Sequence, residues 1–270
     1  AQLPEPKTGT AVLYVQYLGN ASEIAGKEVK VYTNNIWFMS QLSYATTFDD
    51  KGYAKLEVPM AQAQPVYATI KNYGRIFLSP GDTLYAAFDG IWANRLERII
   101  WMGKSAQINY DICKYDNNYW RMAELTRESN TLLNKPVDKY KEARTTLTNK
   151  IAARDKNYFK KNTCSPGFLE LTKIGHQVEE WNDWMRYSWL SERNRESAAQ
   201  LPPEYFNFLK EIDYSNRKYW YSENMAWFLS EIKNWLSSAD QTEKISITLN
   251  EIMEAAFKDD IEIPDSTKKG

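Results

Sequence analysis

Apolar and polar residues alternate at period two through most of the first hundred positions, the pattern of strands that bury one face. The expected inward rows are Ala11, Leu13, Val15 and Tyr17; Val29, Val31 and Thr33; Leu42, Tyr44, Thr46 and Phe48; Ala54, Leu56 and Val58; Val66, Ala68 and Ile70; and Leu84, Ala86 and Phe88. A final strand is expected over Glu97 to Met102. About seven strands in this length predict an antiparallel β-sandwich over residues 10–103.

Two short segments between these runs carry turn chemistry. Asp49-Asp50-Lys51-Gly52 separates two alternating runs and predicts a hairpin loop. In Ser79-Pro80-Gly81-Asp82, proline presets φ and glycine accepts a positive φ, as a type II turn requires. This second turn is therefore expected to join adjacent antiparallel strands, with Gly81 at positive φ.

After Gly103 the apolar period changes from two to about 3.6, which indicates helices. Helices are expected over 105–128, 137–161 and 168–193, then a short one from Tyr205 and two more over 221–235 and 245–257. The predicted fold class is α+β: a sandwich over 10–103 followed by an all-helical region over 104–258. Residues 1–9 and 259–270 are expected to be flexible ends.

Three segments together resemble a known family. They are Gly52 to Val58, Phe77-Leu78-Ser79-Pro80-Gly81-Asp82-Thr83-Leu84, and Gly103-Lys104-Ser105-Ala106-Gln107-Ile108-Asn109-Tyr110. Their order resembles the N-terminal region of exported, thioredoxin-like disulfide reductases of the TlpA type in Gram-negative bacteria. That resemblance implies a small β-sandwich, then a helical linker region, then a thioredoxin domain. The family's Cys-x-x-Cys is missing from this chain, so the resemblance implies the accessory region and no catalytic residue.

Composition narrows the class of protein further. The chain has 270 residues, 43% of them hydrophobic and 26% charged, and a formal net charge of −1. That balance predicts a folded globular protein without the basic footprint of a nucleic-acid binder, and no apolar run is long enough for a membrane-spanning helix. The beginning, Ala1-Gln2 before Leu3-Pro4-Glu5-Pro6, suits a mature end after signal cleavage. Together with the resemblance, this leads us to expect an exported protein, periplasmic or outer-membrane-associated.

The residues that commonly perform chemistry are few. Cys113 and Cys164 are the only cysteines, and two unpaired thiols are favoured over a structural disulfide because their spacing specifies nothing. His176 is the only histidine, so neither a His-rich metal site nor a triad with a second histidine can be built; a neutral residue on a helix surface is expected. The sequence therefore predicts no catalytic, cofactor-binding or metal-binding residue.

Aromatic residues are unusually dense, with ten Trp and eighteen Tyr. The richest window runs from Trp181 to Trp189, and Trp184, Tyr187 and Trp189 fall near or beyond the edge of its core stripe. Such side chains could stack on sugars or on a partner protein, although packing between layers is the favoured reading. Exposure of all three residues on one concave surface would favour ligand binding, and burial of two of the three would exclude the binding hypothesis.

Three functions follow from these observations. The favoured one is a non-catalytic accessory or interaction module of an exported thioredoxin-like protein, with a thioredoxin-like domain or another exported protein as partner. The alternative is an exported ligand- or carbohydrate-binding protein that uses the aromatic window. An independent hydrolase has almost no residue support.

Overall fold

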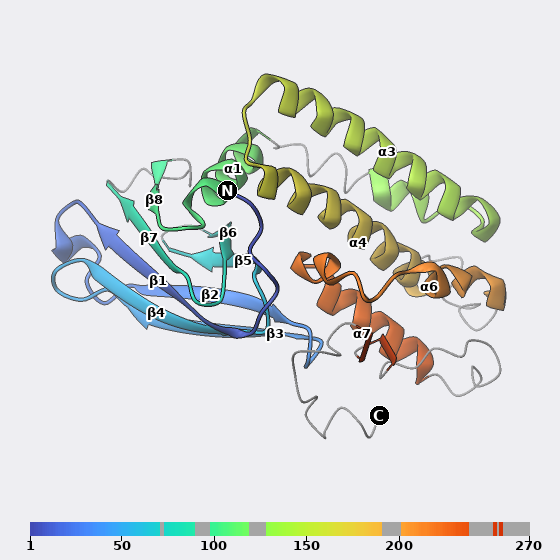
Figure 1. The fold of residues 1–270 in the computed structure, drawn as a ribbon, viewed down its shortest axis with the longest axis horizontal. Helices are drawn as coiled ribbons and strands as arrows, with labels where there is room; N and C mark the ends of the chain where they lie inside the picture. Colours follow the sequence, from blue (N-terminus) through green and yellow to red (C-terminus); the bar gives the residue numbers. More distant parts are fainter. Residues whose placement is uncertain are drawn as a thin grey trace. The chain divides into compact units, whose positions relative to one another are not determined.

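The computed structural model describes residues 1–70, 73–89, 98–118, 128–190, 201–237, 251–252 and 254–255. Contacts along the chain divide it into two compact units. The first contains residues 1–120, 163–172 and 220–223, and the second contains residues 121–162, 173–219 and 224–270. The predicted α+β class is confirmed, because a β-rich N-terminal region is followed by a helical one (Figure 1).

The described strands form two sheets of four. Their bounds are β1 Gly9–Tyr17, β2 Glu28–Asn35, β3 Ser40–Thr47, β4 Tyr53–Met60, β5 Gln64–Thr69, β6 Tyr73–Leu78, β7 Thr83–Phe88 and β8 Ile100–Met102. The first sheet has the order β4-β1-β7-β8 and the second the order β3-β2-β5-β6. The described strands number eight, in line with the approximate count expected. β1 pairs with β7 in parallel, so the first sheet is mixed and not purely antiparallel.

The predicted inward rows make the core of this unit. Leu13, Val31 and Val58 are fully buried, and the other strands of the two sheets contribute the same kind of apolar residue to one continuous cluster. Because side chains alternate across a strand, the rows that lie between these core positions face outward. The row on β3 differs, since Leu42, Tyr44 and Thr46 are only half-buried.

Both turn predictions are right in local geometry and wrong in pairing. Gly81 has a φ of 74°, and the N–H of Asp82 donates to the carbonyl of Ser79 at 3.0 Å, as in a tight turn. However, β6 and β7 belong to different sheets, so this turn crosses between sheets instead of joining adjacent strands. The loop over 49–52 likewise connects β3 of the second sheet to β4 of the first and is not a hairpin. Turn residues specify only local φ and ψ, which are the same in both situations.

The helices follow the predicted periodicity. Their bounds are α1 Ala106–Asn118, α3 Val137–Lys161, α4 Pro166–Leu190, α6 Phe208–Glu211 and α7 Met225–Leu236, with 3-10 turns η1 Ala21–Glu23, η4 Pro203–Asn207 and η5 Arg217–Tyr221. The expected 137–161 helix is confirmed to the residue. Parts of the other predictions lie outside the described residues: 119–127, 191–193, Glu97, most of 245–257 and all of 259–270.

The second unit has a core rich in aromatic residues. Trp181 on α4 packs edge-on against Tyr219, with 4.8 Å between ring centroids, and also against Phe228 on α7. Between α3 and α4, a partly buried ion pair accompanies the apolar contacts: Nε of Arg144 lies 2.7 Å from Oδ2 of Asp183. None of the helices in the described part of the chain is long and apolar enough to cross a membrane.

Candidate functional site

The Ser79–Asp82 turn is fastened to the start of α1. The carboxylate of Asp82 accepts hydrogen bonds from the backbone N–H of Ser105 at 3.0 Å and from its hydroxyl at 2.6 Å. Both residues are buried, and a carboxylate at this end of a helix is also favoured by the helix dipole. Gly103, just before, has a φ of 115°, and a Cβ there would lie 2.4 Å from the carbonyl oxygen of Thr83. The aspartate and the glycine therefore fix the path of the chain.

Asn109 of α1 seals the outer edge of β6. Its amide oxygen accepts from the N–H of Phe77 at 2.8 Å, and its amide nitrogen donates to the Phe77 carbonyl at 3.0 Å and to the Ser105 carbonyl at 3.0 Å. The side chain is completely buried. It supplies the donor and the acceptor that a neighbouring strand would supply, so β6 presents no free pair of hydrogen-bonding groups at this residue.

These contacts explain the motifs behind the family resemblance. Asp82, Gly103 and Asn109 are the residues of those motifs whose chemistry is most specific, and each is used to hold the turn, the helix start or the strand edge. The side chains of Asp82 and Asn109 are therefore engaged in structural contacts, and Gly103 is needed for the backbone path. The motif segments therefore form a structural framework in this chain.

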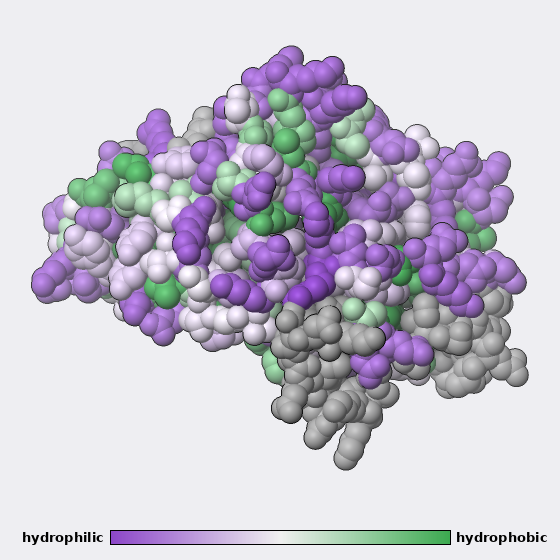
Figure 2. Space-filling model, viewed as in Figure 1, coloured by the Kyte–Doolittle hydropathy of each residue, from purple (hydrophilic) through white to green (hydrophobic). Residues whose placement is uncertain are grey.

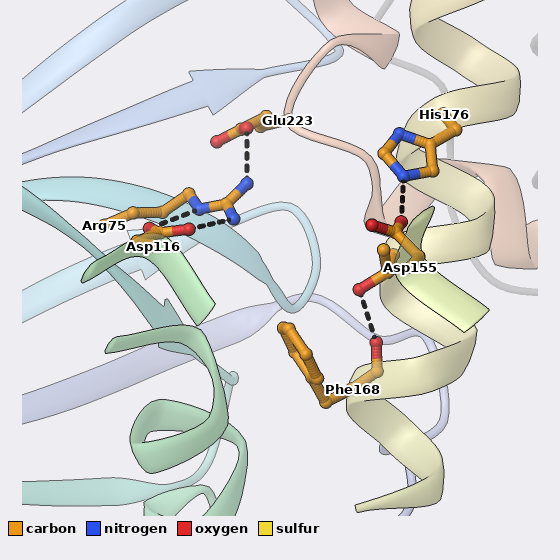
Figure 3. A network of polar contacts seen from close by, with 7 residues as sticks. Arg75, Asp116, Asp155, Phe168, His176 and Glu223 are labelled. Carbon is orange, nitrogen blue, oxygen red and sulfur yellow. Dashed lines mark hydrogen bonds and ion pairs between the residues drawn. The ribbon is translucent and has the colours of Figure 1, made fainter. Parts of the chain in front are cut away.

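Two further polar contacts join distant segments of the first unit. Asp111 on α1 accepts from the backbone N–H and hydroxyl of Ser165, at 2.8 Å and 2.5 Å. Arg75 on β6 binds both carboxylate oxygens of Asp116 at 2.8 Å and 3.2 Å and one oxygen of Glu223 at 3.1 Å (Figure 3). The bidentate geometry is the strong form of an arginine–carboxylate contact. Sequence reasoning missed this triad, because its members lie far apart in the chain and none belongs to a motif.

Several exposed apolar residues of the first unit lie together on the outer face of the first sheet, which we define by Tyr14, Tyr53, Tyr85, Ile100 and Met102. The register places Tyr85 beside Tyr14 on one side and beside Met102 on the other. Four of the five are exposed, Met102 and Ile100 by half of their surface. The Tyr14 and Tyr85 rings stack at 5.3 Å. Figure 2 shows hydrophobic residues in patches among hydrophilic ones on the side of the molecule in view.

This outer face carries little charge among the described residues. Lys55 and Glu57 on β4 are its charged members, and they pair with each other at 2.7 Å. An apolar, nearly neutral sheet face of this kind is a typical site of protein–protein contact. The alternation on β4 and β7 already predicts that Tyr53 and Tyr85 face outward. The sequence alone did not identify this face as a candidate site.

The three aromatic residues of the predicted surface have different surroundings. Tyr187 is buried, stacks on Tyr140 at 4.0 Å and donates its hydroxyl to a backbone carbonyl. Trp184 is half-buried and packs edge-on against Phe208. Trp189 is exposed, and its indole N–H donates to Glu231 at 2.9 Å. They do not share one open surface: one is buried, one is half-buried and one is exposed.

Trp184 instead helps to enclose Lys141 of α3. The lysine Nζ lies 4.3 Å from the ring centroids of both Tyr205 and Phe208 and 5.1 Å from that of Trp184, and it donates to the Tyr205 carbonyl. Burial lowers the pKa of Lys141 to about 8, an effect that the nearby carboxylate of Glu211 partly offsets. This cage already holds a cation supplied by the chain itself, and we assign it a structural role.

The remaining candidates for chemistry are isolated from one another. Cys113 is buried in the sandwich core and Cys164 is half-buried; the two are not bonded to each other. Burial and, to a lesser extent, Asp111 raise the pKa of the Cys164 thiol, which makes it a poorer nucleophile. His176 is half-buried rather than on the surface, and its Nε2 lies 2.5 Å from the buried carboxylate of Asp155 (Figure 3). Within the described residues, no group of three or more potential ligands could hold a metal ion.

Comparisons of the chain with protein-family models, curated proteins and solved structures gave no match. The Asp155–His176 pair and the Arg75 triad are contacts between oppositely polar side chains within the fold. The outer face of the first sheet, with its exposed apolar residues, is the best-supported candidate site.

Proposed function

We propose that this chain is a non-catalytic interaction module of an exported thioredoxin-like protein, working in the periplasm or at the outer membrane of a Gram-negative bacterium. Its docking surface is the outer face of the first sheet. The partner is a thioredoxin-like domain or another exported protein that presents a complementary apolar surface.

The proposal is supported by a difference between two sets of residues: the motif residues are engaged within the fold, whereas residues of the outer face are exposed to solvent. Asp82 and Asn109 use their polar groups to make a rigid framework, whereas Tyr85 and Met102 leave apolar surface open to solvent. Aromatic and methionine side chains are enriched in protein interfaces and bury large areas on binding. A stiff sheet that displays such residues is suited to positioning a partner.

The alternative, a carbohydrate-binding protein, receives less support. A sugar platform needs aromatic rings with open faces, and Tyr187 is buried against Tyr140. Trp189 is exposed, but Arg186 lies 5.2 Å from the centroid of its ring.

Titration calorimetry with a purified thioredoxin-like domain from an exported reductase of the TlpA type tests the proposal. We expect binding to the 270-residue chain, weakened at least tenfold by Tyr85→Lys, because a lysine there introduces a charge into a face that must be desolvated. Phe38→Lys is the matched control, since Phe38 is also an exposed aromatic residue but lies in the β2–β3 turn. Absence of binding, or equal weakening by both variants, would count against the outer face.

A further inference from the structure

Within the described residues, the two sheets of the first unit have four edge strands: β4 and β8 in the first sheet, β3 and β6 in the second. Proteins usually block such edges, because unpaired N–H and C=O groups can recruit another strand. β6 is sealed at Phe77 by Asn109, and β8 is only three residues long. β4 carries Lys55, Glu57 and Pro59, which are common edge-blocking residues.

β3 has none of these devices. Its sequence is Ser-Gln-Leu-Ser-Tyr-Ala-Thr-Thr over eight residues, without a charge, a proline or a glycine. The strand pairs with β2 alone in the described part of the chain. It is therefore an open edge long enough to accept a complete additional strand.

The register shows which backbone groups are open. The N–H of Phe48 donates to the carbonyl of Lys27 at 3.0 Å, and this pair continues the β2–β3 register. In an antiparallel ladder the hydrogen-bonded pairs recur at every second residue, so even-numbered positions of β3 bond to β2. Gln41, Ser43, Ala45 and Thr47 therefore direct their N–H and C=O groups to the open edge, and all four residues are exposed.

The apolar side of β3 is also incompletely covered. Tyr44 packs against the core cluster but is only half-buried, whereas its partner across the ladder, Val31, is fully buried. Leu42 is likewise half-buried beside the buried Thr33. One more strand with apolar residues at alternate positions would cover this row.

We propose that the occupant of this edge is the β3 strand of a second copy of the chain, paired antiparallel about a twofold axis at Tyr44. In that register Ser43 faces Ala45 of the copy and Gln41 faces Thr47 of the copy, so the open backbone groups of both strands meet. The half-buried rows then lie on the same side and cover each other, with the two Tyr44 rings as a cross-strand pair.

Two features favour a second copy over an unrelated strand. The strand is uncharged throughout, so antiparallel self-pairing opposes no like charges. Among the described strands the other three edges are short, sealed or carry blocking residues, so twofold pairing consumes the open edge of each copy and the assembly closes as a dimer. This inference concerns the second sheet and goes beyond the docking function proposed for the outer face of the first.

Sedimentation velocity of the 270-residue chain from about 1 to 500 µM tests the pairing, a range suited to an interface at the small end of the size classes. We expect a concentration-dependent shift from monomer to dimer that reaches a plateau. Ser43→Lys should raise the dissociation constant at least tenfold, because it brings lysines of the two copies close together. Ser22→Lys is the matched control: it makes the same change at an exposed serine outside the strands and should behave as the wild type.

Hydrogen exchange at the lowest and highest of these concentrations provides a second readout. Amides of 40–47 should gain protection at high concentration, whereas those of 53–60 on the blocked β4 edge should not. If Ser43→Lys lowers the melting temperature of the dilute monomer, the Ala45→Lys variant is used in its place as the test of pairing, because Ala45 is also exposed. A monomer at every concentration, a dimer unaffected by the β3 lysine variant, or growth beyond the dimer would overturn the proposal.

Discussion

Replacing Asn109 by alanine should destabilise the first unit more than any change at an exposed position of α1. Asn109 is fully buried and makes three hydrogen bonds, two to Phe77 and one to Ser105. Each contributes about 1 kcal/mol net, and truncation also leaves the buried N–H and C=O of Phe77 without a partner. We expect the free energy of unfolding to fall by about 3 to 5 kcal/mol.

Urea unfolding followed by far-UV circular dichroism measures the overall loss, and hydrogen exchange of the β6 amides assigns it to the first unit. The Phe77 amide should lose most of its protection, because its acceptor is removed. Gln107→Ala is the matched control on the same helix: Gln107 is exposed and makes one side-chain hydrogen bond, to Asp111 at 3.0 Å. Its cost should stay below about 1 kcal/mol.

An Asn109→Asp variant distinguishes the contribution of side-chain size to stability from the contribution of the hydrogen bonds. The aspartate keeps the size and the acceptor for the Phe77 N–H, but an ionised carboxylate cannot donate to the Phe77 carbonyl and carries a buried charge. We expect it to be at least as destabilising as alanine at neutral pH. If Asn109→Ala cost no more than Gln107→Ala, the edge-sealing role of Asn109 would be refuted.

Three further predictions concern other parts of the chain. Gly103→Ala should lower the free energy of unfolding by at least about 1 to 3 kcal/mol, because φ is 115° and the new Cβ would lie 2.4 Å from the Thr83 carbonyl oxygen; unchanged urea stability would contradict this. The folded pKa of Lys141, about 8, lies below its ordinary value of 10.5, so the unfolded state binds more protons between these values and stability should rise from pH 8 toward pH 10. Lys141→Met should abolish that rise, and an identical pH profile for both proteins would show the cause to be different. The chain should not accelerate insulin reduction by dithiothreitol, because Cys113 is buried and the pKa of Cys164 is raised. Activity that disappears in the double Cys113→Ser, Cys164→Ser variant would make the chain an oxidoreductase.

The sequence predicted which face of each strand is buried but not which strands are neighbours. Burial of Leu13 and Leu84 follows from alternation, a local property of every strand. Pairing of β1 with β7 joins segments about 70 positions apart and in parallel, and no local pattern encodes such a contact. The turn at Pro80 and Gly81 illustrates the limit, since its chemistry is the same whether the chain returns to the same sheet or crosses to the other.

Polar residues with structural roles were the hardest to anticipate. Asn109 lies next to the apolar position Ile108 on an amphipathic helix, where an asparagine is expected to face solvent. Its burial depends on β6 ending a sheet at that place, which is a tertiary property. Tyr187 shows the same dependence on tertiary structure: it falls off the apolar stripe of α4, yet Tyr140 and the Lys135 carbonyl give it a buried environment.

The return of the chain to the first unit bears on how this protein folds during synthesis. Glu223 completes the contacts of Arg75 across 148 positions of sequence, and Tyr221 donates its hydroxyl to the carbonyl of Pro4. At translation rates of about 5 to 20 residues per second, the ribosome needs about 7 to 30 s to make the intervening chain.

Throughout that interval the β-rich unit lacks its last partners, while the uncharged β3 edge is already available to neighbouring nascent chains. We therefore expect slow maturation of the N-terminal half and a dependence on factors that hold unfinished chains apart. The first unit is complete only after residues 220–223 have been made and have joined it.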